Sequence, residues 1–456
     1  MKIAGIDIGT TSISLILMDG DSGELLGKKT IEHGSGSFLM SKYETGRIQD
    51  PERICRLAIS GFEELTKGCT DLKAIGMTGQ MHGMLYVDRS GNAVSPLFTW
   101  QDGRGDLILP GDSRSMASFL KEKVGNASTG YGVTTHAFLQ KTGSIPDDAV
   151  SMVTISDYLA MKLCGNSTPF ISMDMAASWG CFDLEKRAFR IDKLEAAGVD
   201  ISFLPEVHSA YDVIGLTREG VPVICSLGDN QASVIGSVQD IASTLLLNVG
   251  TGSQVSMGTD KYVPCTGSVE LRPCTEDMYI MAGSSLCGGR AYAMLEQFYR
   301  GAPGCASEET LYDGMNRQAE DFLAQYGRDE AWKIDTSFSG TRSEPDKCGS
   351  ISGIRVTNFT PGAMTVGMIL GILEELEGYY AKMQEMTGQK ASVLVGSGNG
   401  IRRNPLMRRM AEELFGMPMH IPAFQEEAAC GAALAALHSA GFTGTLKEAQ
   451  GKIRYM

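Results

Sequence analysis

The feature that most constrains the fold is an internal repeat, in which one loop motif occurs twice. Residues Gly5–Ser12 read Gly-Ile-Asp-Ile-Gly-Thr-Thr-Ser, and residues Leu246–Ser253 read Leu-Leu-Asn-Val-Gly-Thr-Gly-Ser. Each copy follows a β-rich run and leads into another short strand. Two copies about half a chain apart predict a duplicated domain. We place the boundary near Asp240, so that residues 1–240 and 241–456 form the two domains.

Strand and helix patterns alternate along the chain, which predicts an α/β fold. The 456 residues are enough for two separate cores. In the first half we expect strands at Lys2–Ile8, Ile13–Met18, Glu24–Ile31, Ala74–Thr78 and Val221–Leu227, and a helix at Pro51–Leu65. In the second half we expect a strand at Ser392–Val395 and helices at Thr365–Met386, Arg402–Leu414 and Glu427–Ala440.

Composition excludes several classes of function. The net charge of −14 and the pI near 5.0 argue against nucleic acid as a partner. We expect no membrane span, because no run of about 18 apolar residues occurs. The N-terminus enters a strand pattern at once, so no signal peptide is expected. Eleven cysteines without a CxxC pair predict reduced thiols and a cytoplasmic location.

The repeated loops are candidate phosphate sites. In Gly9-Thr10-Thr11-Ser12, backbone N–H groups and hydroxyls can point one way, which suits phosphate oxygens, although an ordinary hairpin loop is the alternative. Asp7 favours the phosphate interpretation, because a carboxylate on a buried strand needs a partner such as Mg²⁺ or its water shell. The second copy supplies Gly250, Thr251 and Gly252, which would hold a polyphosphate from the other domain.

Asp229 is the candidate catalytic carboxylate. It lies in Gly228-Asp229-Asn230-Gln231, directly after a strand pattern. The carboxyl end of a parallel strand is where α/β proteins bind ligands. The alternative is that Asp229 is only the N-cap of the following helix.

Two further segments suit a polyol. Gln80-Met81-His82 lies between glycines after a strand and offers donors and acceptors at neutral pH. Trp100-Gln101-Asp102-Gly103-Arg104 places an aromatic face beside polar groups, which matches the apolar C–H faces and hydroxyls of a sugar. The alternative is a Trp packed under a loop, with Arg104 paired to Asp102.

Gly396-Ser397-Gly398-Asn399-Gly400 follows a strand pattern and precedes a helix pattern. Such a unit lets the backbone approach a flat ligand such as a nucleoside. A single Gly-rich loop is weak evidence, and this one is not a Walker A sequence, because no Gly-Lys-Ser/Thr follows.

Together these motifs resemble the FGGY carbohydrate kinases, a branch of the actin-like ATPase superfamily, over essentially the whole chain. The resemblance implies two duplicated actin-like (ribonuclease H-like) domains, with ATP and a sugar in the cleft between them. It also implies Asp229 as the catalytic base and Mg²⁺ held by Asp7 through water and by Asp229. The sugar would contact Gln80, Met81, His82, Trp100, Gln101, Asp102 and Asn230. The adenosine loop would be Gly398 and Asn399, with Asn404 on its helix.

Within the family, Thr99–Arg104 and Ala176–Gly180 are most similar to the kinases of the seven-carbon ketose sedoheptulose. We therefore expect sedoheptulose 7-phosphate as the product, with xylulose or another ketose as the alternative acceptor. A regulatory ATPase without a sugar acceptor is the alternative from another class. One departure is Ser14, where the family often has Lys or Arg, so one cation near the phosphates is missing. The sequence leaves open whether the protein forms a homodimer.

Overall fold

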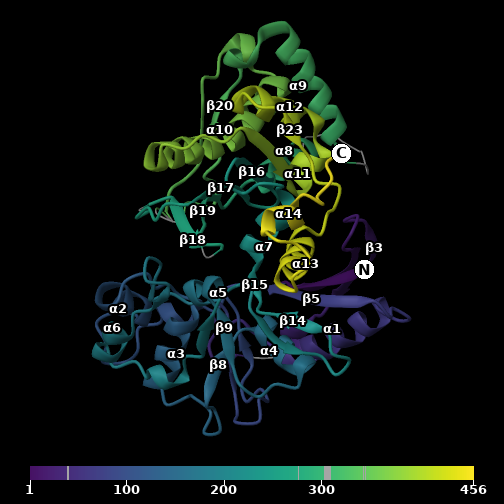
Figure 1. Cartoon of the computed structure of the whole chain (residues 1–456). Coiled ribbons are helices and arrows are strands. Elements are labelled where there is room, and N and C mark those ends of the chain that lie inside the picture. Colours follow the sequence, from purple (N-terminus) through teal and green to yellow (C-terminus); the bar gives the residue numbers. More distant parts are fainter. Residues whose placement is uncertain (39–40, 266, 276, 302–309, 342–343, 345) are drawn as a thin grey trace. The chain divides into compact units, whose positions relative to one another are not determined.

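The computed structural model describes residues 1–38, 41–265, 267–275, 277–301, 310–341, 344 and 346–456. Contacts divide the chain into two compact units (Figure 1). The first unit comprises Met1–Gln239, Arg272–Asp277 and Glu426–Ile453. The second comprises Asp240–Leu271, Met278–Gln425 and Arg454–Met456. The chain passes from the first unit to the second between Gln239 and Asp240, and two later segments belong again to the first unit.

The first unit is built on a seven-stranded mixed sheet of order β13-β14-β5-β1-β2-β3, with β15 paired to β5. β1 runs antiparallel to β2 and parallel to β5, so β1 lies in the middle of the sheet. The strands are β1 (Lys2–Ile8), β2 (Ser12–Asp19), β3 (Leu25–Glu32), β5 (Leu72–Gly79), β13 (Val213–Leu216), β14 (Pro222–Ile224) and β15 (Leu227–Gly228).

Helices α1 (Pro51–Leu65), α4 (Ile155–Cys164), α7 (Asp229–Ser237) and α13 (Glu427–Ser439) contact this sheet. α1 begins as its sequence predicts, because Pro51 lies in the first turn and the Asp50 side chain accepts a hydrogen bond from the Arg53 amide. A second core lies around Trp179 and Phe182. Its elements include α2 (Met116–Lys123), α3 (Gly132–Lys141), α5 (Met173–Ser178) and α6 (Ile191–Ala196), with β6 (Leu85–Val87), β8 (Ser151–Val153), β9 (Phe170–Ser172), β10 (Phe182–Asp183), β11 (Ala188–Phe189) and β12 (Glu206–His208).

The second unit repeats the strand arrangement of the first. Its sheet has the order β18-β19-β17-β16-β22-β23, and β16 runs antiparallel to β17 and parallel to β22, as β1 does to β2 and β5. The strands are β16 (Thr244–Val249), β17 (Ser253–Thr259), β18 (Val269–Pro273), β19 (Tyr279–Ser285), β22 (Val393–Ser397) and β23 (Met419–His420). The loop motif that occurs twice in the sequence therefore lies between equivalent strands of two sheets with the same local topology.

The helices of the second unit include α8 (Gly289–Arg300), α9 (Tyr312–Tyr326), α10 (Pro361–Thr387), α11 (Gly398–Arg403) and α12 (Pro405–Phe415). A single helix over Arg402–Leu414 was the wrong expectation. α11 ends at Arg403, and Asn404 takes an extended conformation as the N-cap of α12, where its Oδ1 accepts a 3.0 Å hydrogen bond from the Met407 amide. Pro405 explains the break, because the helical region is sterically disfavoured for a residue that precedes proline.

The strand expected at Val221–Leu227 is also interrupted, because β14 ends at Ile224 and β15 begins at Leu227. The described cysteines are free, and Cys305 lies outside the described residues. Among the helices that the structure describes, none is both long and apolar enough to cross a bilayer.

Candidate functional site

The ends of three neighbouring strands form the centre of the site in the first unit. β1 and β15 both run parallel to β5, with Asp7 opposite Thr78 and with Gly228 opposite Gly79. Gly9, Gln80 and Asp229 follow these strands and therefore come to the same edge of the sheet, where α/β proteins bind ligands. Thr78 strengthens this edge by donating a 2.9 Å hydrogen bond from Oγ1 to the Leu227 carbonyl.

Asp229 is the first residue of α7, and its N-cap is Gly228, so Asp229 is not the N-cap. Burial raises the pKa of the Asp229 carboxyl, while the positive charge of Arg272 and a hydrogen bond from the Asn230 amide lower it. The influence of Arg272 was not visible in the sequence, because this residue lies near the end of β18, where the chain leaves the second unit and the Arg272–Asp277 segment of the first unit begins. The segment is held there by Gln231, whose Nε2 donates a 2.9 Å hydrogen bond to the Pro273 carbonyl.

Asp7 lies near Asp229 and is coupled to it electrostatically. Burial, and secondly the negative charge of Asp229, raise the pKa of Asp7 to about 7. Its Oδ1 is buried and has no hydrogen-bond partner among the described residues. Two carboxylates in this state fit a divalent cation, because a cation would satisfy the open oxygen and offset the repulsion.

No group of three or more His, Cys, Asp or Glu side chains in the described part of the chain could enclose a metal. The Asp7–Asp229 pair therefore fits Mg²⁺ better than a metal that needs a closed set of protein ligands. Mg²⁺ is usually held by one or two carboxylates together with water and substrate phosphates.

The first loop, Gly9–Ser12, is a tight turn between antiparallel strands, closed by a 2.9 Å hydrogen bond from the Gly9 amide to the Ser12 carbonyl. Thr10 is held on both sides. Its carbonyl accepts a 2.7 Å hydrogen bond from Gln49 Nε2, and its hydroxyl accepts one of 2.9 Å from Trp100 Nε1. A hydroxyl that accepts from Trp100 still has its own proton to donate, which suits a phosphate oxygen.

Gln49 connects the first loop to the Gln80 segment, because Gln80 Nε2 donates a 3.1 Å hydrogen bond to Gln49 Oε1. Gln80 is buried, and its Oε1 has no partner among the described residues. Met81 is also buried and belongs to the core around Trp179. Gln49 was missed in the sequence, because nothing in its short strand β4 (Ile48–Gln49) marks it as functional.

His82 has an unusual backbone conformation for a non-glycine residue, with φ of 71°. Ser178 stabilises it twice, since Ser178 Oγ accepts from the His82 amide at 3.0 Å and the Ser178 carbonyl lies 2.6 Å from His82 Nδ1. A carbonyl only accepts, so Nδ1 carries the proton, and Nε2 is the acceptor of the neutral ring. The imidazole stacks on Tyr131 with a centroid distance of 4.5 Å. Strained backbone of this kind clusters at functional sites.

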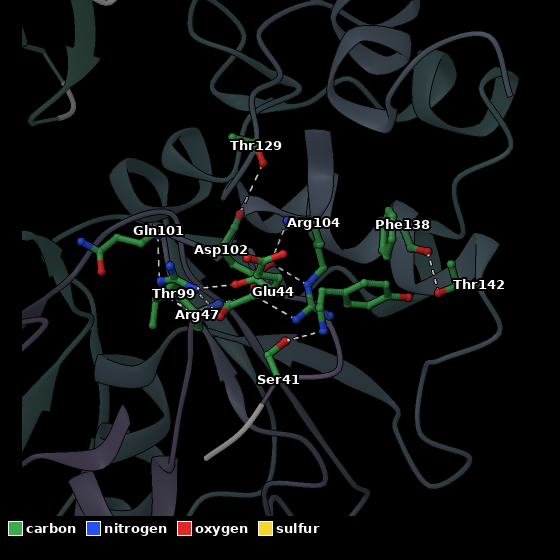
Figure 2. A network of polar contacts seen from close by, with 12 residues as sticks. Ser41, Glu44, Arg47, Thr99, Gln101, Asp102, Arg104, Thr129, Phe138 and Thr142 are labelled. Atoms are coloured by element: carbon green, nitrogen blue, oxygen red, sulfur yellow. Dashed lines mark hydrogen bonds and ion pairs between the residues drawn. The ribbon is translucent and has the colours of Figure 1, made fainter. Parts of the chain in front are cut away.

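The Trp100 loop is shaped by a buried ion pair (Figure 2). Asp102 is fully buried, and its carboxylate accepts hydrogen bonds from Arg104 Nε at 2.6 Å, Arg104 Nη2 at 2.9 Å and the Arg47 amide at 3.0 Å. The pairing considered from the sequence is therefore present. Asp102 holds the loop, and any effect of Asp102 on a sugar would act through the loop's shape.

Trp100 and Gln101, which precede the ion pair in this segment, are exposed. Trp100 is 45% exposed, so it is not packed under the loop. The Gln101 side chain is exposed and points away from the Asp102 network in Figure 2. Asn230, next to Asp229, is partly buried and has an Oδ1 without a partner in the described structure.

In the second unit, the second loop and the Gly396–Gly400 segment lie side by side. Asn248 pairs with Ser397 across the parallel strands β16 and β22. Gly398 has a φ of +79°, and a Cβ there would lie 2.5 Å from the Val249 carbonyl, so only glycine fits. Thr251 and Asn399 are exposed at this edge, whereas Asn404 is largely buried as the N-cap of α12.

Two protein-family models match the chain, one in each half. The N-terminal domain model of the FGGY family of carbohydrate kinases matches residues 2–236, and its C-terminal domain model matches residues 245–440. The mouse (Mus musculus) sedoheptulokinase is 28% identical, with 95% of this chain and 96% of that protein aligned. A glycerol kinase of Pseudomonas fluorescens is 23% identical, with 99% of this chain and 90% of that protein aligned.

Solved structures show the same two-domain fold. A ligand-bound xylulose kinase from Lactobacillus acidophilus superposes with a TM-score of 0.83 at 19% identity, covering 100% of this chain and 92% of that one. The Plasmodium falciparum glycerol kinase with ADP superposes with a TM-score of 0.82 at 18% identity, covering 99% and 93%. The actin-like α/β fold expected from the sequence is confirmed.

Proposed function

Because the chain belongs to the FGGY family of carbohydrate kinases, we propose that it transfers the γ-phosphate of ATP to a terminal hydroxyl of a ketose. Sedoheptulose is the proposed acceptor and sedoheptulose 7-phosphate the product. The observation that carries the mechanism is the placement of Asp229 at the strand edge that also holds Asp7 and Gln80. The choice of sugar rests on similarity to a sedoheptulokinase over nearly the whole chain.

Asp229 acts as the general base in this proposal. The carboxylate accepts the proton of the attacking hydroxyl as the loose phosphoryl transition state forms. Arg272 supports the role, because its positive charge counteracts the rise in the Asp229 pKa that burial causes. A base must be ionised at the working pH, so a residue that keeps Asp229 charged favours catalysis.

Asp7, through water, and Asp229 would hold Mg²⁺, which when bound neutralises charge on the phosphates. Gly9, Thr10, Thr11 and Ser12 in the first unit, and Gly250, Thr251 and Gly252 in the second, would hold phosphate oxygens. Gly398, Asn399 and Asn404 would contact adenosine. The Ser14 position lacks the family's usual cation, and we propose that Arg272 supplies positive charge to the site in its place.

The sugar would be bound by the first unit. Trp100 supplies a face for its C–H groups, while Gln80, His82, Gln101 and Asn230 offer hydrogen bonds, and Met81 packs beneath them. Asp102 contributes by fixing the Trp100 loop. We also propose a cytoplasmic location, supported by the free cysteines of the described chain. A homodimer stays a prediction that sedimentation would test.

Substitution of Asp229 tests the proposed base. Asp229→Asn should retain the fold and the binding of ADP and sedoheptulose, but turnover should fall by about 10²–10⁴-fold because no carboxylate accepts the proton. ADP release in a coupled assay measures the rate, and phosphorus NMR identifies the sugar phosphate. Wild-type turnover by this variant would mean that Asp229 is not the base.

Metal removal tests the proposed role of Asp7. Turnover should stop in excess chelator and return with Mg²⁺, because the phosphates then lack charge neutralisation. Asp7→Asn should raise the Mg²⁺ concentration needed for half-maximal rate while leaving the sedoheptulose Kd unchanged. Full activity with chelator present would contradict the mechanism.

A further inference from the structure

Two carboxylates near the site are buried and do not pair with a basic side chain in the described part of the chain. Asp157 is 0% exposed and Asp174 is 1% exposed. The groups that act on them are hydroxyls, backbone amides and other acids, and within the described chain neither carboxylate forms an ion pair. A buried carboxylate is costly unless its oxygens are satisfied by hydrogen bonds. Their partners therefore indicate what these two side chains hold in place.

Both carboxylates bind the backbone directly before Asp229. Asp157 Oδ1 accepts from the Ser226 amide at 3.2 Å and from the Ser226 hydroxyl. Asp174 Oδ2 accepts a short hydrogen bond of 2.6 Å from the Gly228 amide. β15 is only two residues long, so its pairing with β5 alone fixes little of the chain that leads into α7. The two carboxylates supply the missing anchors.

Asp174 also belongs to α5, the helix that contacts the Gln80–His82 segment. It lies in the first turn of α5, where Ser172 Oγ donates a 2.5 Å hydrogen bond to Asp174 Oδ1. The same helix ends at Ser178, which binds both the amide and the ring of His82. One helix of six residues thus holds the amide before Asp229 at one end and His82 at the other.

We propose that Asp174 is a positioning residue for Asp229, and that α5 sets the distance between Asp229 and the Gln80–His82 segment. The inference rests on the proposed function, since it assumes that Asp229 is the base. Asp174 acts through the Gly228 amide and does not touch the substrate. Its contribution is geometric, and a misplacement of about 1 Å at a reacting group can reduce a rate by about 10²-fold.

Three variants separate this role from simple packing. Asp174→Ala removes the acceptor for the Gly228 amide. Asp174→Asn removes the charge but keeps an oxygen that can accept from that amide. Ser172→Ala is the matched control, because it removes the hydrogen bond to the other carboxylate oxygen and an α5 cap while leaving the Gly228 contact in place.

The readout is kcat with ATP and sedoheptulose, divided by the fraction of sites that bind sedoheptulose in isothermal titration calorimetry. This division removes any loss that comes only from unfolded protein. Asp174→Ala should lower kcat per binding site by about 10- to 100-fold, with the sedoheptulose Kd within about twofold of wild type. Asp174→Asn should recover to within about threefold of wild type, because the acceptor remains. Ser172→Ala should lower the Tm but keep kcat.

The proposal is overturned if Asp174→Ala keeps the wild-type kcat per binding site, or if Ser172→Ala loses as much as Asp174→Ala. It is equally overturned if Asp174→Asn is as slow as Asp174→Ala, because the hydrogen bond would then not be the cause. Asp229→Asn runs alongside as a reference. An inactive Asp229→Asn beside a fully active Asp174→Ala refutes the positioning role alone, whereas an active Asp229→Asn refutes the proposed base and this proposal with it.

Discussion

At the scale of single residues, the first unit concentrates acids whose carboxyl groups resist ionisation. Burial is the leading cause of the raised pKa for Asp7, Asp157, Asp174 and Asp229. For Asp229, the positive charge of Arg272 opposes the effect of burial. The proposed base therefore has a positive charge beside it, while Asp157 and Asp174 are stabilised by hydrogen bonds from backbone and hydroxyl groups.

The pH dependence of stability should report the buried acid Asp157. Burial raises its pKa from the ordinary 3.8 to about 7 in the folded protein. Between these values the folded chain keeps a proton that the unfolded chain releases, so stability falls as pH rises from about 4 to about 7. One such group contributes a slope of up to about 1.4 kcal/mol per pH unit.

Asp157→Asn should remove this share of the slope. Relative to wild type, the variant's free energy of unfolding should therefore increase as the pH is raised from about 5 to about 7.5, as measured by urea denaturation. Asp148→Asn, at an exposed position, is the control and should follow the wild-type curve. A constant difference between Asp157→Asn and wild type at every pH would contradict the expected effect of burial.

At the scale of elements, close packing of α13 explains why a late helix joins the first unit. Figure 1 shows α13 beside β5 and α7, which it contacts. A Cβ at Gly76 of β5 would lie 1.8 Å from the Ala432 carbonyl, and one at Gly5 of β1 would lie 1.9 Å from the Ala429 carbonyl. The alanine-rich helix and the strand glycines therefore form one contact surface between backbones.

Gly76→Ala should be strongly destabilising, because the new methyl group overlaps a backbone that cannot move without displacing α13. Overpacking commonly costs about 1–3 kcal/mol, and an overlap with backbone should reach the upper end or exceed it. Gly378→Ala in α10 is the matched control, since a Cβ there meets nothing within 4 Å. It should be neutral or stabilising by up to about 1 kcal/mol. Equal Tm values for the two variants would contradict this account of the packing.

The sequence predicted the elements where local pattern and fold agree. The strand at Lys2–Ile8 and the helix at Pro51–Leu65 have the expected bounds, because hydrophobic periodicity and a capped first turn define them. Asn404 was expected inside a helix, whereas Pro405 disfavours the helical conformation of the residue before it, and Asn404 is extended. Tertiary contacts between distant segments bring three further residues to the site: Arg272, Gln49 and Asp174. Such contacts cannot be predicted from a local sequence pattern.

At the scale of the whole molecule, the chain has two units built on one strand arrangement, and it is a carbohydrate kinase by family. The repeat supplies a glycine loop to each unit, and the segments between the repeated strands differ. In the first unit they form the Gln80 and Trp100 segments, and in the second the Gly398 segment. The proposed acceptor specificity therefore belongs to the first unit.

The choice of acceptor is the central proposal, and kcat/KM for sedoheptulose and for xylulose on one enzyme preparation tests it most directly. A longer sugar carries two more hydroxymethine groups, and a site built to hydrogen-bond them has unpaired polar groups when the shorter sugar binds. Such discrimination can reach about 10⁴-fold, although water that fills the gap reduces it. The proposal predicts the larger kcat/KM for sedoheptulose. An equal or larger value for xylulose would contradict the seven-carbon assignment.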